Sequence, residues 1–170
     1  MAIPKLIENI SANTKARILR KRLKDLQFGD ISWKSTTGST NQDLLETAEK
    51  MPKHLSVAIA DHQTAGRGRL EREWLSEKKA SLLMSVLFMD DSVSDLIGLY
   101  SMKLSVAAVK ALQGMGFQGV KIKWPNDLVT IHNGEAHKLS GVLAQTVIKG
   151  PDAVVVVGIG INIMLSNFRD

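Results

Sequence analysis

The chain has 170 residues, a formal net charge of +5 and a hydrophobic content of 44%, which fits one domain with its own core. It contains no cysteine, and this excludes disulfides, thiolate catalysis and zinc sites built from cysteine. No stretch resembles a signal peptide, and the longest apolar runs, 82–89 and 153–161, are too short to cross a membrane, so a cytoplasmic protein without a membrane partner is expected.

The excess positive charge lies at the N-terminal end. Residues 1–36 hold eight Lys or Arg and three Asp or Glu, whereas residues 37–170 hold fourteen of each. A helix capped by Asn13 or Thr14 is expected to run to about Gln27. We interpret its basic residues as a solvated surface; the alternative is a contact with nucleic acid, although one helix is too little for a helix-turn-helix reader. The apolar face by which the helix would dock consists of Ile18, Leu19, Leu23 and Leu26.

Apolar spacing and turn residues predict the other elements in chain order. Ser39 and Gln42 form a capping box that opens a helix through about Lys50, with Leu44, Leu45 and Ala48 directed inward. A longer helix is expected over 92–115, ending at Gly116, and the Asn-Gly pair at 133–134 predicts a tight hairpin. Strands are expected over 55–61, 80–89, 120–124, 128–131, 137–148 and 153–161. This pattern predicts an α+β domain with one mixed, mostly antiparallel sheet flanked by helices.

Residues 66–74 read Gly-Arg-Gly-Arg-Leu-Glu-Arg-Glu-Trp and carry the clearest chemical signal. Glycine lets the backbone approach a ligand closely, and arginine offers a fork of donors that fits carboxylate and phosphate oxygens. The run is therefore expected to wrap around an anion. It is neither a P-loop nor the dinucleotide fingerprint, because it has neither Gly-Lys-Ser/Thr nor the spacing Gly-x-Gly-x-x-Gly. Taken alone, it would also fit a solvated basic turn.

An ordered set of segments surrounds this Arg/Gly run. They are Ser39-Thr40-Asn41-Gln42, Asp61-His62-Gln63-Thr64-Ala65, Lys123-Trp124-Pro125-Asn126-Asp127, Lys138-Leu139-Ser140-Gly141-Val142-Leu143 and Gly158-Ile159-Gly160-Ile161-Asn162. From about Thr36 to Met164, the chain resembles the catalytic domain of the biotin–protein ligases. The resemblance implies a biotin/lipoate ligase-like fold, similar to class II aminoacyl-tRNA synthetases. It also implies that ATP activates biotin as biotinyl-5′-AMP, with release of pyrophosphate, and that biotin then passes to a lysine of a carboxylase biotin-carrier domain.

The resemblance also assigns roles to individual residues. The catalytic residues would be Lys138, Arg67 and Arg69, with Lys138 stabilising charge on the α-phosphate and the amides of Gly66 and Gly68 helping to hold the reacting groups. The biotin-binding residues would be Ser39, Thr40, Gln63, Gly66, Arg67, Gly68, Lys138, Gly141 and Leu143. The nucleotide-binding residues would be Arg69, Arg72, Trp74, Asn126, Asp127 and Asn162, with Asp127 also holding Mg²⁺ through the phosphates.

Several of these residues have a structural alternative. Ser39 could cap a helix, Trp74 could pack in the core, and Lys138 could be a solvent-facing lysine of an edge strand. Asn126 and Asp127, which follow a proline, would by themselves fit an ordinary turn. The four histidines show no metal-ligand spacing.

Two features depart from the family pattern. Glu71 stands where these ligases usually have glycine; it could pair with Arg69 or Arg72 and raise the KM for ATP. The chain also stops at Asp170, whereas relatives continue with further helices and a small β-barrel-like domain. Residues 1–170 are therefore expected to form one catalytic domain that lacks its C-terminal end and the small β domain, whether by truncation, degeneration or natural reduction. No winged helix-turn-helix precedes the domain, so no DNA partner is expected.

Other functions stay open at this point. A lipoate–protein ligase would share the fold and the acyl-adenylate chemistry. A module that binds biotin or adenylate without turnover would follow if Glu71 and the missing segment abolish the reaction. A nucleic-acid contact through residues 15–24 is the third alternative. The final strand, if exposed, could also pair across a two-fold axis in a homodimer.

Overall fold

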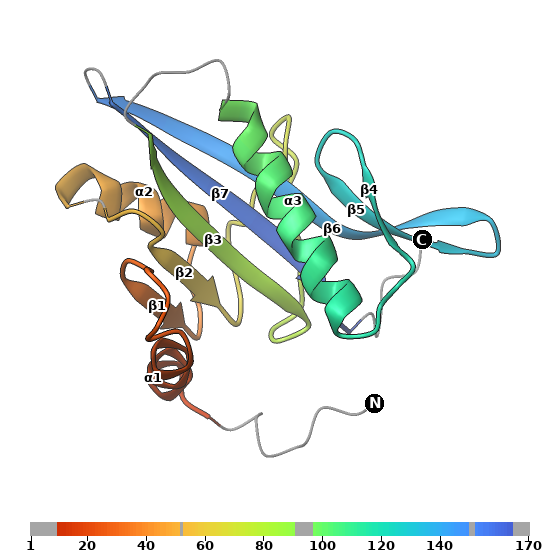
Figure 1. Cartoon of the computed structure of the whole chain (residues 1–170), viewed down its shortest axis with the longest axis horizontal. Helices are drawn as coiled ribbons and strands as arrows, with labels where there is room; N and C mark the ends of the chain where they lie inside the picture. Colours follow the sequence, from red (N-terminus) through yellow and green to blue (C-terminus); the bar gives the residue numbers. More distant parts are fainter. Residues whose placement is uncertain (1–9, 52, 91–96, 150–151, 165–170) are drawn as a thin grey trace.

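The computed structural model describes residues 10–51, 53–90, 97–149 and 152–164, which form one seven-stranded sheet with three helices (Figure 1). The helices are α1 (Ala12–Arg22), α2 (Thr40–Lys50) and α3 (Ile97–Gly114). The strands are β1 (Ile31–Lys34), β2 (Val57–Ala60), β3 (Ser81–Asp90), β4 (Val120–Lys123), β5 (Asp127–His132), β6 (Glu135–Lys149) and β7 (Asp152–Asn162). Their order is β1-β2-β3-β7-β6-β5-β4, and every pair except the parallel β1–β2 is antiparallel. The predicted α+β fold with a mixed, mostly antiparallel sheet is confirmed.

Local turn chemistry explains two of the predicted boundaries. Asn133 and Gly134 both have positive φ, 51° and 83°, which is the backbone of the type I′ turn expected between β5 and β6. After α3, Gly116 takes a φ of 99°, and the N–H of Phe117 donates to the carbonyl of Leu112 at 3.0 Å. This hydrogen bond is that of a Schellman motif, and it confirms the C-cap predicted at Gly116. The predicted start of this helix, at 92, lies outside the described residues.

The N-terminal helix differs from its prediction at both ends and on its apolar face. The hydroxyl of Ser11 accepts the N–H of Thr14, so α1 begins before the predicted caps, and it ends at Arg22 where the chain turns toward β1. Leu19 and Leu23 pack against the cluster under β1 and β2, as predicted. Ile18 and Leu26 are instead 45% and 58% exposed. Leu26 lies beyond the end of the helix, and Ile18 lies outside the face that Leu19 and Leu23 turn to the sheet.

Two strands also differ from the prediction. β1 was missed, because a four-residue run with one tryptophan and one lysine carries little periodic signal. β2 was predicted over 55–61 as an alternating strand, but all four residues of Val57–Ala60 are buried. An inner strand that is covered on both faces has no solvent side, so its side chains need not alternate in polarity.

Helices cover the two faces of the sheet. α3 crosses one face (Figure 1), on a cluster of Val120, Leu128, Val142, Val155, Val157, Ile159 and Ile161. α2 packs on the other face of the sheet through Leu44 and Ala48, with Leu45 partly buried beside them, as predicted. The strand residues that complete this cluster are Ala58, Leu87, Val154 and Val156. Because alternate residues of a strand share a face, positions 158 and 160 of β7 lie on the α2 face. Within the described residues, no helix is long and apolar enough to cross a membrane.

The final strand, β7, lies inside the sheet, between β3 and β6. Both of its edges are paired, with β3 along 153–162 and with β6 along 152–161. The expectation that this strand is exposed and could pair across a two-fold axis is therefore wrong. The outermost strands are β1 and β4.

A largely buried ion pair fixes α1 to the sheet. Lys15 Nζ lies 2.7 Å from Asp61 Oδ1, and the indole N–H of Trp33 donates to the same oxygen at 2.9 Å. The two charged side chains are only 12% and 10% exposed. Removing one partner of such a pair leaves an uncompensated charge, so Lys15→Met is expected to lower the free energy of unfolding by about 3 kcal/mol.

Urea denaturation measures this loss. Arg17→Met, which changes an exposed residue of the same helix, is the matched control and is expected to stay within about 0.5 kcal/mol of the parent. Equal losses in the two variants would show that the ion pair does not hold α1 in place.

Candidate active site

A cavity of about 250 Å³ opens on the α2 face of the sheet, beside the C-terminal half of β7. Its walls come from segments far apart in the chain: the start of α2, the segment after β2, the Arg/Gly run, the β4–β5 turn, β6 and β7. The predicted site residues that line it are Ser39, Thr40, Gln63, Arg67, Gly68, Arg69, Arg72, Trp74, Asn126, Asp127, Lys138, Gly141 and Leu143. The fold thus gathers most of the predicted set around one hollow.

Two predicted site residues do not line this cavity. Gly66 is buried, its carbonyl accepts the N–H of Trp74 at 2.9 Å, and a Cβ atom there would lie 2.6 Å from the Trp74 oxygen. Its glycine is thus required for close packing within the loop. Asn162, at the end of β7, accepts a hydrogen bond from the hydroxyl of Ser81 at 3.1 Å. In this geometry the Asn162 side chain links the end of β7 to the start of β3 by a hydrogen bond.

The Arg/Gly run folds into a small β-hairpin. Arg67 and Glu73 form an antiparallel bridge, and the N–H of Gly68 donates to the carbonyl of Arg72 at 2.7 Å. The hairpin therefore uses the amide of Gly68 internally, and a contact of this amide with the ligand stays a prediction. The arginine side chains remain exposed and line the cavity.

The tip of this hairpin is a type I′ turn. Leu70 and Glu71 have φ values of 55° and 60°, and the N–H of Arg72 donates to the carbonyl of Arg69 at 3.2 Å. Both tip residues thus adopt the left-handed conformation that glycine accepts most easily. In the described part of the chain, Glu71 pairs with neither arginine, so the expected ion pair is wrong.

Backbone conformation, rather than pairing, then explains why glycine suits position 71. Glu71→Gly is expected to raise the free energy of unfolding by about 1 kcal/mol, since it removes the cost of a left-handed side-chain residue. It is also expected to strengthen the binding of pyrophosphate, used as a probe anion, about threefold, because a negative charge leaves the arginine-rich hairpin. Thermal unfolding and calorimetry with pyrophosphate measure the two effects.

Glu71→Gln separates the two causes, because it removes the charge and keeps the backbone demand. We expect it to lower the Kd for pyrophosphate without raising the free energy of unfolding. An unchanged Kd in both variants would mean that Glu71 does not affect anion binding at the hairpin.

An ion pair and a bridging amide form the polar wall of the cavity. Lys138 Nζ lies 2.9 Å from Asp127 Oδ1, a contact without the geometry of a hydrogen bond. Arg69 donates to the Asn126 side-chain oxygen at 3.1 Å, and the Asn126 amide donates to the carbonyl of Val142 at 3.1 Å. The β4–β5 turn, which carries Asn126 and Asp127, is thus hydrogen-bonded to the Arg/Gly hairpin on one side and to β6 on the other.

A register shift in β6 brings Lys138 to this wall. Leu128 pairs with Ser140 while Val129 pairs with Lys138, so β6 carries one extra residue at this point. Such a bulge puts residues an odd number apart on the same face, and here it directs both Lys138 and Gly141 to the cavity. The Lys138 side chain is 51% exposed at the mouth.

The floor of the cavity is a patch of glycine backbone. Gly141 pairs with Gly160, and Leu143 pairs with Gly158. The Trp74 ring lies on this patch: a Cβ atom on Gly160 would be 2.5 Å from Trp74 Cε2, and one on Gly141 would be 3.1 Å from Cζ3. Trp74 is therefore part of the cavity wall rather than of the hydrophobic core, and Lys138 Nζ lies 5.9 Å from its ring centroid.

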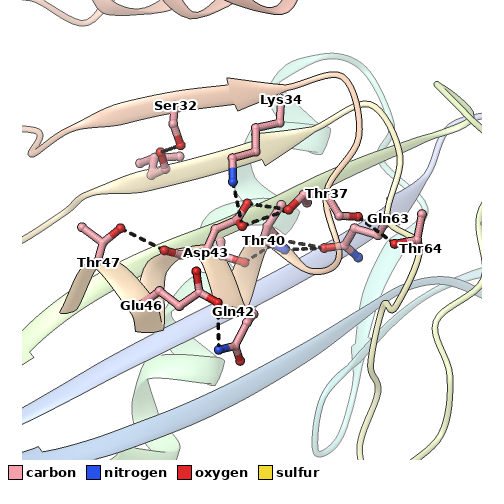
Figure 2. A network of polar contacts seen from close by, with 12 residues as sticks. Ser32, Lys34, Thr37, Thr40, Gln42, Asp43, Glu46, Thr47, Gln63 and Thr64 are labelled. Atoms are coloured by element: carbon pink, nitrogen blue, oxygen red, sulfur yellow. Dashed lines mark hydrogen bonds and ion pairs between the residues drawn. The ribbon is translucent and has the colours of Figure 1, made fainter. Parts of the chain in front are cut away.

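The start of α2 is held differently from the prediction. Ser39 occupies the N-cap position, but its side chain makes no capping hydrogen bond, and Gln42 donates to Glu46 instead of closing a capping box. The N–H of Thr40 donates to Gln63 Oε1 at 2.8 Å (Figure 2). A side chain from the segment after β2 thus supplies the cap, and Ser39 is among the residues that line the cavity.

Asp43 ties the segment before α2 to the helix. Figure 2 shows its carboxylate receiving the Thr37 hydroxyl and the Lys34 ammonium group, each at 2.9 Å. Thr37 also forms a parallel bridge with Gln63. This arrangement fixes Gln63 relative to the first turn of α2.

Eight residues that line the cavity were not predicted as site residues, among them Asn41, Gly158 and Gly160. Ser85, beneath the cavity, was not predicted either. Two glycines at alternate positions of an otherwise valine- and isoleucine-rich strand indicate that another group approaches the strand backbone closely. The sequence alone could therefore have identified Gly158 and Gly160. Asn41 and Ser85 are 5% and 0% exposed, and only the packing of α2 on β3 reveals their contact.

Known proteins resemble this chain in sequence and in fold. The biotin/lipoate A/B protein ligase family matches residues 33–162. The bifunctional ligase/repressor BirA of Escherichia coli (strain K12) is 34% identical over 150 residues, which cover 87% of this chain and 45% of that protein. The biotin–[acetyl-CoA-carboxylase] ligase of Mycobacterium tuberculosis is 35% identical over 132 residues, covering 75% of this chain and 47% of that one. The chain spans about half the length of the curated relatives it matches.

Solved structures of ligases also share the fold of this chain. A biotin protein ligase from Aquifex aeolicus, in complex with biotin and ATP, has a TM-score of 0.63 and 30% identity, covering 84% of this chain and 56% of that chain. A lipoate protein ligase from Thermoplasma acidophilum has a TM-score of 0.52 at 10% identity, covering 82% and 63%. The second likeness shows a common fold alone.

Proposed function

Because the chain belongs to the biotin/lipoate A/B protein ligase family, we propose that it is an ATP-dependent biotin–protein ligase. It would form biotinyl-5′-AMP from biotin and ATP and transfer biotin to a lysine of a carboxylase biotin-carrier domain. One observation carries the proposal: a single cavity joins the polar groups of Thr40 and Gln63 to the Arg/Gly hairpin and Lys138. The named relatives that support biotin as the acid are themselves biotin ligases.

In the first step, two anions must meet. An oxygen of the biotin carboxylate bonds to the α-phosphorus, and the bond from that phosphorus to the pyrophosphate oxygen breaks. Four basic side chains, Arg67, Arg69, Arg72 and Lys138, line the cavity against two acidic ones, Glu73 and Asp127, so the cavity favours anions.

Each cationic side chain would bind a different group of the two reacting anions. Arg67 and Arg69 would hold the carboxylate and α-phosphate in line, which removes most of the entropic barrier between them. Lys138, a point charge on a flexible stem, would stabilise the negative charge that grows on the α-phosphate. Arg72 would bind the leaving pyrophosphate.

The neutral ends of the two substrates would bind on either side of this centre. Ser39, Thr40 and Gln63 would hydrogen-bond the ureido ring of biotin, and Gly141 and Leu143 would flank its tail. Trp74 and Asn126 would contact the nucleotide. A buried neutral ring needs a few fixed polar partners of this kind.

Magnesium would arrive with ATP. The described residues contain no group of three or more His, Asp or Glu side chains that could hold a metal ion. Magnesium in nucleotide sites is usually bound by one or two carboxylates plus phosphates, so the carboxylate of Asp127 at the cavity wall fits it. Asp127 would hold the ion, which would supply positive charge beside the phosphates.

In the second step, the amine of the carrier lysine would attack the mixed anhydride, and AMP would leave. Lys138 and the hairpin arginines would stabilise the departing phosphate as they do in the first step. We assign both steps to the cytoplasm, the location expected from the sequence.

Biotin-dependent release of pyrophosphate from ATP tests the proposal, with lipoate as the competing acid. We expect release with biotin and none with lipoate. Biotin binding without release would identify a binding module, and release with lipoate alone would identify a lipoate ligase.

A further inference from the structure

A row of oxygen atoms runs beneath the cavity, from Gln63 to Asn41. Thr40 Oγ1 lies 2.9 Å from Gln63 Oε1 and 2.7 Å from Ser85 Oγ, and Ser85 Oγ lies 2.6 Å from Asn41 Oδ1. Thr40, Ser85 and Asn41 are 3%, 0% and 5% exposed. Each contact therefore needs a proton from the protein, because buried oxygens that are left unpaired are costly.

The backbone fixes both ends of this row as acceptors. Gln63 Oε1 receives the N–H of Thr40 at 2.8 Å, so its amide cannot be turned around. The Asn41 amide nitrogen donates to the carbonyl of Leu143 at 3.3 Å and to the Gln145 side-chain oxygen at 2.7 Å, which directs Asn41 Oδ1 toward Ser85. Neither terminal oxygen carries a proton.

The row is consequently one proton short, since three contacts share two hydroxyl protons. The Ser85 proton goes to Asn41, which has none to give. Thr40 can donate either to Gln63 or to Ser85, and each choice leaves one pair of oxygens with facing lone pairs. A proton directed to Gln63 leaves the buried pair of hydroxyl oxygens at 2.7 Å, whereas a proton directed to Ser85 leaves the wider pair, at 2.9 Å, beside the cavity where a ligand can donate to it. The second arrangement costs less, so we assign the Thr40 proton to Ser85. Thr40 Oγ1 and Gln63 Oε1, 2.9 Å apart at the cavity, are left as two adjacent acceptors.

We propose that Ser85 is a positioning residue that makes Thr40 and Gln63 a paired acceptor for one N–H of the ligand. This inference rests on the proposed function, in which the ureido ring of biotin occupies this end of the cavity. A ureido N–H supplies the missing proton, whereas the dithiolane ring of lipoate has no N–H to give. Sites that hydrogen-bond a substrate N–H reject analogues without it, because their own polar groups are then left unpaired. Ser85 thus contributes to the choice of acid without touching it.

The first test is Ser85→Ala. It frees the Thr40 proton to turn to Gln63, so the KM for biotin is expected to rise about tenfold, while kcat stays within about twofold. Ser105→Ala is the matched control: Ser105 is 1% exposed, but its hydroxyl donates to its own helix, at Ser101 O. An unchanged KM in Ser85→Ala would overturn the proposal.

The second test separates proton direction from general damage. The two lactam analogues of biotin each replace one ureido N–H by a methylene group. In the parent protein, calorimetry is expected to show that one lactam binds at least about tenfold more weakly than biotin, and that this ratio falls below about threefold in Ser85→Ala. The same ratio in both proteins would overturn the proposal.

Two further outcomes are distinguishable. If the parent protein does not bind biotin, the proposed function fails and this inference with it; if it binds biotin and Ser85 has no effect on the lactam ratio, only the inference fails. Should Ser85→Ala not fold, Ser85→Cys replaces it, since a thiol fills the space but donates and accepts weakly. An intermediate lactam ratio is then expected, and an unchanged one would count against the role of Ser85.

Discussion

Replacing Lys138 with alanine is expected to lower the rate of biotin-dependent pyrophosphate release by about two to three orders of magnitude. Lys138 lines the cavity, and a register shift in β6 directs it there. Its ammonium group would stabilise charge that develops only during the reaction. We therefore expect kcat to fall more than the KM for biotin rises, as measured by initial rates at saturating ATP.

The ion pair with Asp127 calls for two further variants. Lys138→Ala leaves that carboxylate unbalanced, and its charge alone would repel ATP. The single variant Asp127→Asn measures the loss that comes from the missing carboxylate alone. A double variant Lys138→Ala/Asp127→Asn that is much slower than Asp127→Asn would assign the further loss to the missing ammonium group. Lys121→Ala, an exposed lysine of β4 that is not among the residues lining the cavity, is the control and is expected to retain full activity. Full activity in Lys138→Ala would remove Lys138 from the reaction.

The second large effect is expected for Gly160→Ala. Its added methyl group would lie 2.5 to 2.8 Å from three atoms of the Trp74 indole, so the ring must move off the glycine patch. The backbone N–H of Trp74 donates a hydrogen bond to the carbonyl of Gly66 at the base of the Arg/Gly hairpin. A displaced Trp74 would therefore also displace the arginines of the hairpin. Since a misplacement of about 1 Å can cost about a hundredfold in rate, we expect a loss of that order in pyrophosphate release. Overpacking is also expected to lower the free energy of unfolding by about 1–3 kcal/mol.

A graded series of glycine variants checks this explanation. Gly141→Ala brings a methyl group to 3.1 Å from the same ring, which a small shift relieves, so a smaller loss is expected. Gly114→Ala, at the end of α3, meets no atom within 4 Å and is expected to leave activity unchanged. Losses that do not follow the order Gly160, Gly141, Gly114 would show that displacement of Trp74 is not the cause.

The sequence by itself determined the elements whose causes are local. The turn at Asn133 and Gly134 and the cap at Gly116 need positive φ, which these residues accept most readily, so their positions could be predicted. The strands β3 and β7 follow from continuous apolar runs, and the apolar face of α2 follows from helical periodicity within one segment. The ordered motifs from Ser39 to Asn162 likewise identified the family and most of the residues that line the cavity.

Only the tertiary structure decided the features that join distant segments. Gln63 caps α2 from 23 residues away, and Ser85 meets Thr40 from 45 residues away. The central place of β7 depends on pairing with both β3 and β6, which no property of its own residues reveals. A backbone N–H or a hydroxyl accepts any well-placed partner, so local sequence leaves that partner undetermined. For this reason the direction of the Thr40 proton, and with it the acceptor pair at the cavity, follows from packing and not from the motif.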